Sequence, residues 1–230
     1  MDLKNGQMRK LDERGNPIQT ETPDKGTITK GAEDSMTYTN KVIDKSRRVC
    51  TLSQSMIEML VKQLSAELAN HSLYRTFANY FAVEGLPKLE EYFKERAKEE
   101  YLHHDWIYNY LSENDAIFQY PPVPPINVDI TNRIMPFDAT VDREIETTMG
   151  INLIVEQAKK EGDWATFQWL HGNDPQGGML VKEQVEEESV SRTVADMAKE
   201  EASWLRKQHA ILDFYKDLGR SEKRLGIIIY

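Results

Sequence analysis

Polar residues interrupt the apolar stripes of several helical segments of this chain. Counting by three and four residues from apolar neighbours lands repeatedly on glutamate, histidine or glutamine. Two pairs, Glu100 with His103 and Gln184 with Glu187, have the three-residue spacing that puts both side chains on one helix face. The residues that share this property come from four segments: Glu67, Glu100, His103, Glu144, Gln184 and Glu187.

Buried carboxylates of this kind need a compensating cation. Burying one ionised carboxylate without a partner costs several kcal/mol, so four helices that each deliver one to a shared core favour a bound divalent metal. Two such ions would neutralise four glutamates. Oxygen-rich ligands with one or two nitrogens suit iron, and Glu combined with Glu-x-x-His is a ligand pattern of di-iron helical bundles. The pattern therefore indicates a di-iron centre.

Each motif alone also has a plainer interpretation. A single Glu-x-x-His pair such as Glu100 and His103 occurs by chance on many solvated helix faces. Glu67 or Glu144 at the edge of an apolar stripe would stay solvated, so its charge would cost little free energy. Residues 183–188, taken alone, are typical of a charged surface. The coincidence on four helices is what favours the metal centre over these alternatives.

The elements that must position these residues are four long helices. The first follows an N-cap at Ser53 or Ser55 and ends near residues 84–85, and the second opens at Pro87. The third spans about residues 138–160, and the fourth begins at Asp163, is interrupted over residues 171–178 and resumes at Met179. The residues expected to point inward from the third helix are Val141, Ile145, Ile151 and Val155.

The connections and flanks complete the predicted architecture. Prolines over residues 120–125 cannot be helical and make a long extended link. The pattern predicts an all-α fold, an up-down-down-up four-helix bundle with one long crossover. We expect a flexible polar extension at residues 1–50, the bundle at 51–198, and a C-terminal helical extension and tail at 199–230. Residues 199–218 are expected to continue as amphipathic helix.

Composition limits the classes of function. The 230 residues are 40% hydrophobic, enough for a core, and their formal charge of −9 argues against a nucleic-acid-binding protein. No apolar stretch is long enough to span a membrane and the polar N-terminus has no secretion signal, so we expect a cytoplasmic protein. A single cysteine, Cys50, excludes an internal disulfide framework and a cysteine-based zinc site.

Over residues 53–198 the sequence resembles the bacterial non-haem ferritins. The segments that carry the resemblance are residues 56–60 with Glu67 and Tyr74, then 96–103, 150–152, 163–167 and 183–188. The resemblance implies iron storage with ferroxidase activity: oxidation of Fe(II) by O2 or hydrogen peroxide, and mineralisation inside a homo-oligomeric shell. That shell normally has 24 subunits, and the resemblance implies the same number here, although the C-terminus departs from the family.

The resemblance also implies a role for each site residue. The residues implied for the di-iron centre are Glu67 and His103 on the first iron, Glu100 bridging both irons, Glu144 on the second iron with Gln184 nearby, and Tyr74 as a hydrogen-bonding electron donor. A third, looser iron position would use four carboxylates: Glu99, Glu183, Glu186 and Glu187.

The chain differs from the haem-binding bacterioferritins at two positions, and it has one histidine that is not part of the non-haem pattern. The haem-binding bacterioferritins carry a second Glu-x-x-His in the fourth helix and a methionine after the bridging glutamate. This chain has Glu187 and Tyr101 at those places, so no haem is expected. His71 lies one turn from Glu67, and we favour a supporting or core histidine there over an extra ligand.

The interruption at residues 171–178 makes the chain about seven residues longer than typical members, close to two helical turns, which keeps the later stripe in phase. In the family this part of the helix lines three-fold channels, so the hypothesis is that the inserted loop alters iron uptake. A neutral surface bulge is the alternative.

Two other functions fit part of the pattern. A storage subunit without catalysis would use the same carboxylates only to nucleate mineral. A di-iron oxidase acting on an organic substrate would usually carry two Glu-x-x-His pairs, whereas this chain has only the pair Glu100 and His103.

Overall fold

Helices make up most of the chain that the computed structural model describes, which is residues 50–172 and 180–218, all within the unit Lys45–Tyr230. The predicted extension apart from Cys50, residues 173–179, which include most of the predicted loop, and residues 219–230 of the predicted tail lie outside the described residues. The helices are α1 (Gln54–Val83), α2 (Pro87–Glu113), α3 (Met135–Glu161), α4 (Trp164–Leu170), α5 (Leu180–Lys199) and α6 (Trp204–Asp217). No strand occurs in the described ranges, so the all-α prediction is confirmed.

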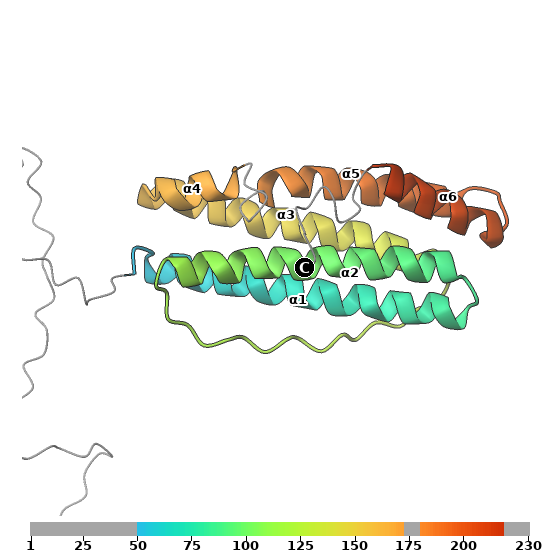
Figure 1. Cartoon of the computed structure of the whole chain (residues 1–230), viewed down its shortest axis with the longest axis horizontal. Coiled ribbons are helices and arrows are strands. Elements are labelled where there is room, and N and C mark those ends of the chain that lie inside the picture. The colour runs from blue at the N-terminus through green and yellow to red at the C-terminus, as the bar shows by residue number, and fades with distance from the viewer. Residues whose placement is uncertain (1–49, 173–179, 219–230) are drawn as a thin grey trace, which may run out of the picture. The chain divides into compact units, whose positions relative to one another are not determined.

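The long helices follow the up-down-down-up order (Figure 1). A tight turn with Gly85 at a φ of 69° joins α1 to the antiparallel α2. An extended crossover, residues 114–134, then runs back along the bundle, so that α3 lies in the same direction as α2 (Figure 1). Helices α4 and α5 return along α3. The four-helix bundle with one long crossover is therefore confirmed.

Local signals explain where the helices begin and end. Ser53 is the N-cap of α1, and its hydroxyl accepts a hydrogen bond from the backbone N–H of Met56 at 3.0 Å. Pro87 stands at the first position of α2. Gly162 ends α3 in the left-handed conformation, with a φ of 70°. Asp163 then caps α4, accepting from the N–H of Thr166 at 3.0 Å.

Two apolar clusters fill the bundle and leave a polar layer between them. On α1, one cluster ends at Leu68 and the other begins at Leu73. On α2, one cluster ends at Ala97 and the other begins at Trp106. Between these limits the buried residues are Ala69 and Asn70 on α1 and Glu99, Glu100, His103 and His104 on α2. Buried Glu67 directly precedes Leu68, so the glutamates and the histidine of the sequence motifs on α1 and α2 lie where the two clusters meet.

The prediction that Ile145 points inward is wrong. Its side chain is 37% exposed, and Met149 and Leu153 on the same face are exposed as well. Glu144 takes the inward position instead, with Thr140 one turn before it. Successive residues of a helix are about 100° apart, so a side chain next to an inward Glu144 must point away from the core.

The prediction of continuous helix over residues 199–218 is also wrong. Helix α5 ends at Lys199, and α6 begins after Ser203. The ammonium group of Lys207 donates to the backbone carbonyl of Ala198 at 2.7 Å, which satisfies an acceptor left open by the end of α5. The chain therefore turns back on itself between α5 and α6.

Packing explains this turn. Helix α6 lies against α2, where the rings of Tyr215 and Tyr92 meet edge-on with centroids 5.1 Å apart. Ile211 and Leu212 are also buried there. A straight continuation of α5 would leave these apolar side chains in water, so their burial favours the hairpin even though no glycine or proline marks the turn.

None of the helices within residues 50–172 and 180–218 combines the length and the apolar character needed to cross a membrane.

Candidate metal centre

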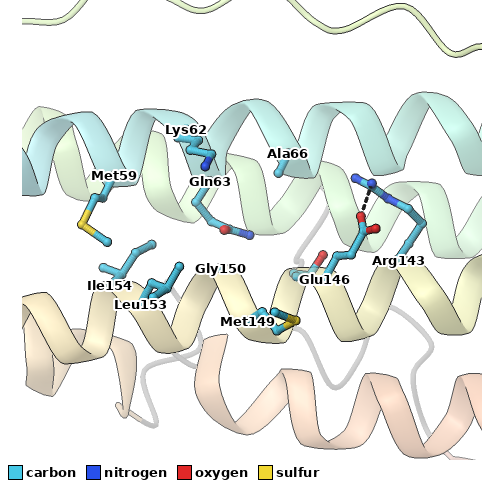
Figure 2. A pocket seen from close by; sticks show the side chains of 11 residues that line it. Met59, Lys62, Gln63, Ala66, Arg143, Glu146, Met149, Gly150, Leu153 and Ile154 are labelled. Carbon is cyan, nitrogen blue, oxygen red and sulfur yellow. Dashed lines mark hydrogen bonds and ion pairs between the residues drawn. The ribbon is translucent and has the colours of Figure 1, made fainter.

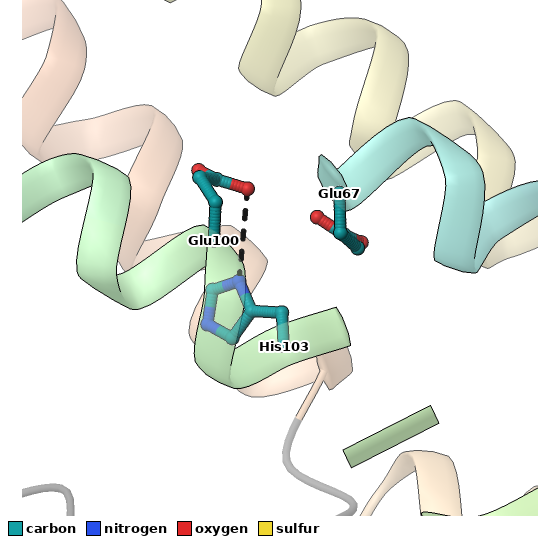
Figure 3. A group of neighbouring side chains, drawn as sticks. All are labelled: Glu67, Glu100 and His103. Atoms are coloured by element: carbon teal, nitrogen blue, oxygen red, sulfur yellow. Dashed lines mark ion pairs between the residues drawn. The ribbon is translucent and has the colours of Figure 1, made fainter. Parts of the chain in front are cut away.

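Three of the predicted ligands meet in the polar layer. Glu67 from α1 and Glu100 and His103 from α2 each offer a ligand atom, and these atoms lie within 4.8 Å of one another (Figure 3). All three side chains are buried. The Nδ1 atom of His103 is 3.9 Å from Oε2 of Glu100. We call these three residues the Glu–Glu–His site.

Two oxygens of the Glu–Glu–His site have no hydrogen-bond donor. They are Oε2 of Glu67 and Oε1 of Glu100, both buried. An ionised carboxylate only accepts, so a buried oxygen without a donor is costly unless a cation or a proton satisfies it. Two carboxylates and one imidazole form an oxygen-rich set with one nitrogen, which fits a divalent iron ion.

Side chains around the site hold the ligands in place. Gln63, one turn before Glu67, donates from Nε2 to Oε1 of Glu67 at 2.7 Å. Gln63 and Gly150 line a pocket of about 400 Å³ between α1 and α3 (Figure 2). A Cβ atom at Gly150 would lie 2.5 Å from Oε1 of Gln63. A side chain larger than glycine at this place would therefore displace the amide end of Gln63.

Asn70 of α1 contacts Glu100. Its Nδ2 atom donates to Oγ1 of Thr147 at 3.0 Å and lies 3.4 Å from Oε2 of Glu100. Its carbonyl oxygen accepts from Arg143. The sequence reasoning missed Asn70, although it stands three residues after Glu67 and therefore shares its helix face.

Glu144 lies beside the Glu–Glu–His site but is already hydrogen-bonded. Its Oε1 atom accepts from the hydroxyl of Tyr74 at 2.5 Å and from Nη2 of Arg96 at 2.5 Å. Its Oε2 atom accepts from Nε2 of Gln184 at 2.8 Å. The structure thus brings Glu144, Gln184 and Tyr74 together as expected from the sequence, around a partner that the sequence did not indicate.

That partner is Arg96, which is fully buried. Its Nη1 atom is 3.0 Å from Oε2 of Glu99 and also pairs with Glu187. We call Arg96 with Glu99, Glu144 and Glu187 the arginine cluster. Arg96 lies on the buried stripe of α2, three residues after Phe93, but an arginine at that spacing from a glutamate is also typical of a surface ion pair.

The carboxylates expected at a third iron position separate into two groups. Glu99 and Glu187 are buried in the arginine cluster, whereas Glu183 and Glu186 are half-buried on α5. His71 is half-buried, and its Nδ1 atom is 2.7 Å from the carbonyl oxygen of Ala97. This contact agrees with the supporting role that was favoured for His71.

Burial and the neighbouring charges together shift the pKa values of the centre. Burial, followed by the charge of Glu100, holds the pKa of Glu67 well above its usual range, and the same two causes raise the pKa of Glu144. Burial acts upward on Glu100 too, but the contact with His103 outweighs it and lowers the pKa of Glu100. Burial opposes charge on His103, yet Glu100 raises the pKa of this imidazole. A divalent ion would therefore displace protons.

Known proteins match the chain in both sequence and fold. The family model "Ferritin-like domain" matches residues 57–199. The bacterial non-heme ferritin of Staphylococcus aureus (strain USA300) is 29% identical over 142 residues, which are 62% of this chain and 81% of the relative. The bacterial non-heme ferritin of Bacteroides fragilis (strain 638R) is 24% identical over 148 residues, 64% of this chain and 89% of the relative.

Solved structures give the same result. An engineered closed form of the Archaeoglobus fulgidus ferritin aligns with a TM-score of 0.60 and 25% identity, covering 74% of this chain and 97% of that one. The Chlorobium tepidum ferritin aligns with a TM-score of 0.60 and 24% identity, covering 74% of this chain and 98% of that one. With its family match, its bundle topology and its buried carboxylates, the chain belongs to the ferritin family, among relatives named bacterial non-heme ferritins.

Proposed function

We propose that this protein stores iron: Fe(II) binds in the bundle, is oxidised to Fe(III) by O2 or hydrogen peroxide, and is kept as mineral inside a homo-oligomeric shell in the cytoplasm. The observation that carries the proposal is the Glu–Glu–His site, where three buried residues each offer a ligand atom and one oxygen of each carboxylate has no hydrogen-bond donor. A divalent cation bound to these oxygens would compensate their buried negative charge and so stabilise the folded protein.

Each residue has a defined task in this proposal. Glu67 and His103 bind the first Fe(II), and Glu100 lies between this ion and the second position. Glu144 is the carboxylate of the second position, held in orientation by Gln184. Tyr74 is the residue to which we assign the transfer of a proton or an electron to the centre, because its hydroxyl donates to Glu144.

The carboxylates nearer α5 continue the path. Glu99, Glu183, Glu186 and Glu187 would receive Fe(III) on its way to the mineral. The names of the relatives support storage as the function, and the match to ferritin structures supports a shell, for which we propose 24 subunits. The bound iron is both substrate and electron donor, so the protein supplies geometry, charge and a route for protons.

One experiment tests the function. Fe(II) is added to the aerobic apoprotein while ferric absorbance is followed, and the particle size is measured by size-exclusion chromatography. We expect fast oxidation by a very large particle, and loss of the fast phase in the double variant Glu100→Ala, His103→Ala. A double variant that oxidises iron at the parent rate overturns the site, and a small dimer favours an oxidase of another substrate.

A further inference from the structure

Arg96 is the largest side chain that is fully buried in the described part of the protein. Its guanidinium group lies among carboxylates from α2, α3 and α5: Glu99, Glu144 and Glu187. A fourth carboxylate oxygen, Oε1 of Glu100, is 4.0 Å away. An arginine side chain is permanently ionised and presents its donors in a planar fork, so it is well suited to hold several carboxylates at once.

Glu144 of the arginine cluster differs from the two carboxylates of the Glu–Glu–His site in its hydrogen bonds. In the Glu–Glu–His site, Oε2 of Glu67 and Oε1 of Glu100 have no donor. In the arginine cluster, both oxygens of Glu144 accept from protein donors, one of them the guanidinium. One half of the buried centre is therefore open to a cation, and the other half already contains one.

The guanidinium of Arg96 lies where the proposed second iron would bind. The second iron of the proposed function would lie between Glu100 and Glu144, and this is where Nη2 of Arg96 stands, 2.5 Å from Glu144 and 4.0 Å from Glu100. A divalent ion entering there would meet a fixed positive charge in a buried site, where charges are weakly screened. It would also have to replace the contacts of the guanidinium to Glu144.

We propose that Arg96 is a resident counter-cation at the second metal position. The folded chain binds one divalent ion tightly at the Glu–Glu–His site, and a second ion binds only where the guanidinium has left Glu144. This inference rests on the proposed function, because it takes the Glu–Glu–His site as the place of the first ion. Arg96 is in this sense a specificity-determining residue that sets how many ions the centre holds.

The test counts the metal ions that the protein binds under conditions in which the metal cannot be oxidised. The full-length apoprotein, as the intact assembly, is titrated with Zn(II) by isothermal calorimetry, because zinc is redox-inert and binds carboxylates and imidazole. We compare the parent protein with Arg96→Gln. We expect the variant to bind one more tight ion per chain than the parent, with an affinity for this ion at least about tenfold higher once the fixed charge is removed.

A control shows whether the effect belongs to this arginine. Arg133 forms an ion pair with Glu84 at 2.5 Å at the surface of the bundle, with 38% of its side chain exposed. Arg133→Gln should leave the number of tight Zn(II) ions unchanged. Equal numbers of ions in the parent and in Arg96→Gln overturn the proposal, even if every ion binds tightly.

A second measurement decides the question if Arg96→Gln does not fold. Crystals of the parent protein are soaked in Zn(II) and the anomalous signal is mapped. Density at Glu67, Glu100 and His103 with none between Glu100 and Glu144 supports the proposal, and two peaks overturn it. Failure of the proposed function looks different: Zn(II) then binds the parent and a Glu67→Ala variant alike, and the role of Arg96 falls with the site.

Discussion

Gly150 on α3 and Gln63 on α1 approach so closely that a Cβ atom on the glycine would lie 2.5 Å from Oε1 of the glutamine. The same Gln63 donates to Glu67 from the other atom of its amide, Nε2, at 2.7 Å. Gln63 thus connects a glycine on the third helix to Glu67, a predicted ligand on the first. Groups that orient metal ligands commonly affect affinity as strongly as some ligands do.

The first prediction follows from this contact. Gly150→Ala should displace Gln63 and weaken the first Zn(II) ion by about tenfold or more, as expected for a change behind a ligand. Gln63→Ala should have a similar effect. If both act through one hydrogen bond, the double variant is no worse than the single variants, because effects on one interaction do not add. Additive losses would show that Gly150 acts by another route.

A second prediction concerns the stability of the metal-free protein. Burial and the charge of Glu100 raise the pKa of Glu67, so its ionised form opposes folding. Glu67→Gln removes this charge and should stabilise the apoprotein by about 1 kcal/mol or more, as buried charges replaced by neutral groups often do. The same variant should gain little stability from Zn(II). Thermal unfolding with and without the metal measures both effects, and a destabilised apoprotein would contradict the first.

The pH dependence of binding gives a third prediction. The pKa values of Glu67 and His103 are raised, so the metal-free site holds protons at pH values where free side chains have lost them. A divalent ion must displace these protons, and its affinity should fall as the pH is lowered through the raised pKa of His103. Calorimetry in buffers of different ionisation enthalpy counts the protons released. No release at neutral pH would contradict the prediction.

The stability of the apoprotein depends on pH in the opposite direction to the metal affinity. Because the pKa of Glu67 is higher in the folded than in the unfolded chain, the folded state binds more protons in the window above the ordinary carboxylate pKa. The contribution of Glu67 to the stability of the apoprotein is therefore greatest below that window and is lost as the pH rises through the folded pKa. Glu67→Gln should flatten this part of the stability profile.

The hairpin between α5 and α6 supplies the fourth prediction. Lys207 is buried, donates to the carbonyl of Ala198, and lies 4.5 Å from the ring of Trp204. Lys207→Ala should cost about 1–3 kcal/mol, because it leaves a helix-end carbonyl without its donor. Lys216→Ala is the matched control: its pair with Glu91 is exposed and should contribute about 0–1 kcal/mol. Chemical denaturation compares the two, and equal losses would argue against a special role for Lys207.

The residues of the Glu–Glu–His site could be predicted from the sequence because each breaks a regular apolar stripe. Glu67, Glu100 and His103 stand where helical periodicity requires burial, and the structure buries them. Arg96 could not be assigned in this way. Its place three residues before Glu99 is the same for a surface ion pair as for a buried one, and only the packing of α3 and α5 against α2 decides between them.

The errors in the predicted fold have a similar origin. Ile145 is apolar and its position fits the stripe nearly as well as that of Glu144, so composition favoured the wrong neighbour. The turn at residues 200–203 contains neither glycine nor proline, and Ser203 was the only local signal of a new helix. The turn exists because α6 finds a partner in α2, a contact far apart in the sequence.

The buried guanidinium of Arg96 also has a consequence for the folding of the metal-free protein. Many small metal-binding domains unfold without their metal, because the ligands repel one another. Here Glu99, Glu144 and Glu187 pair with Arg96, a positive charge that belongs to the same chain and needs no metal. We therefore expect the protein to fold without iron, and the yield of folded apoprotein should not depend on the iron content of the growth medium.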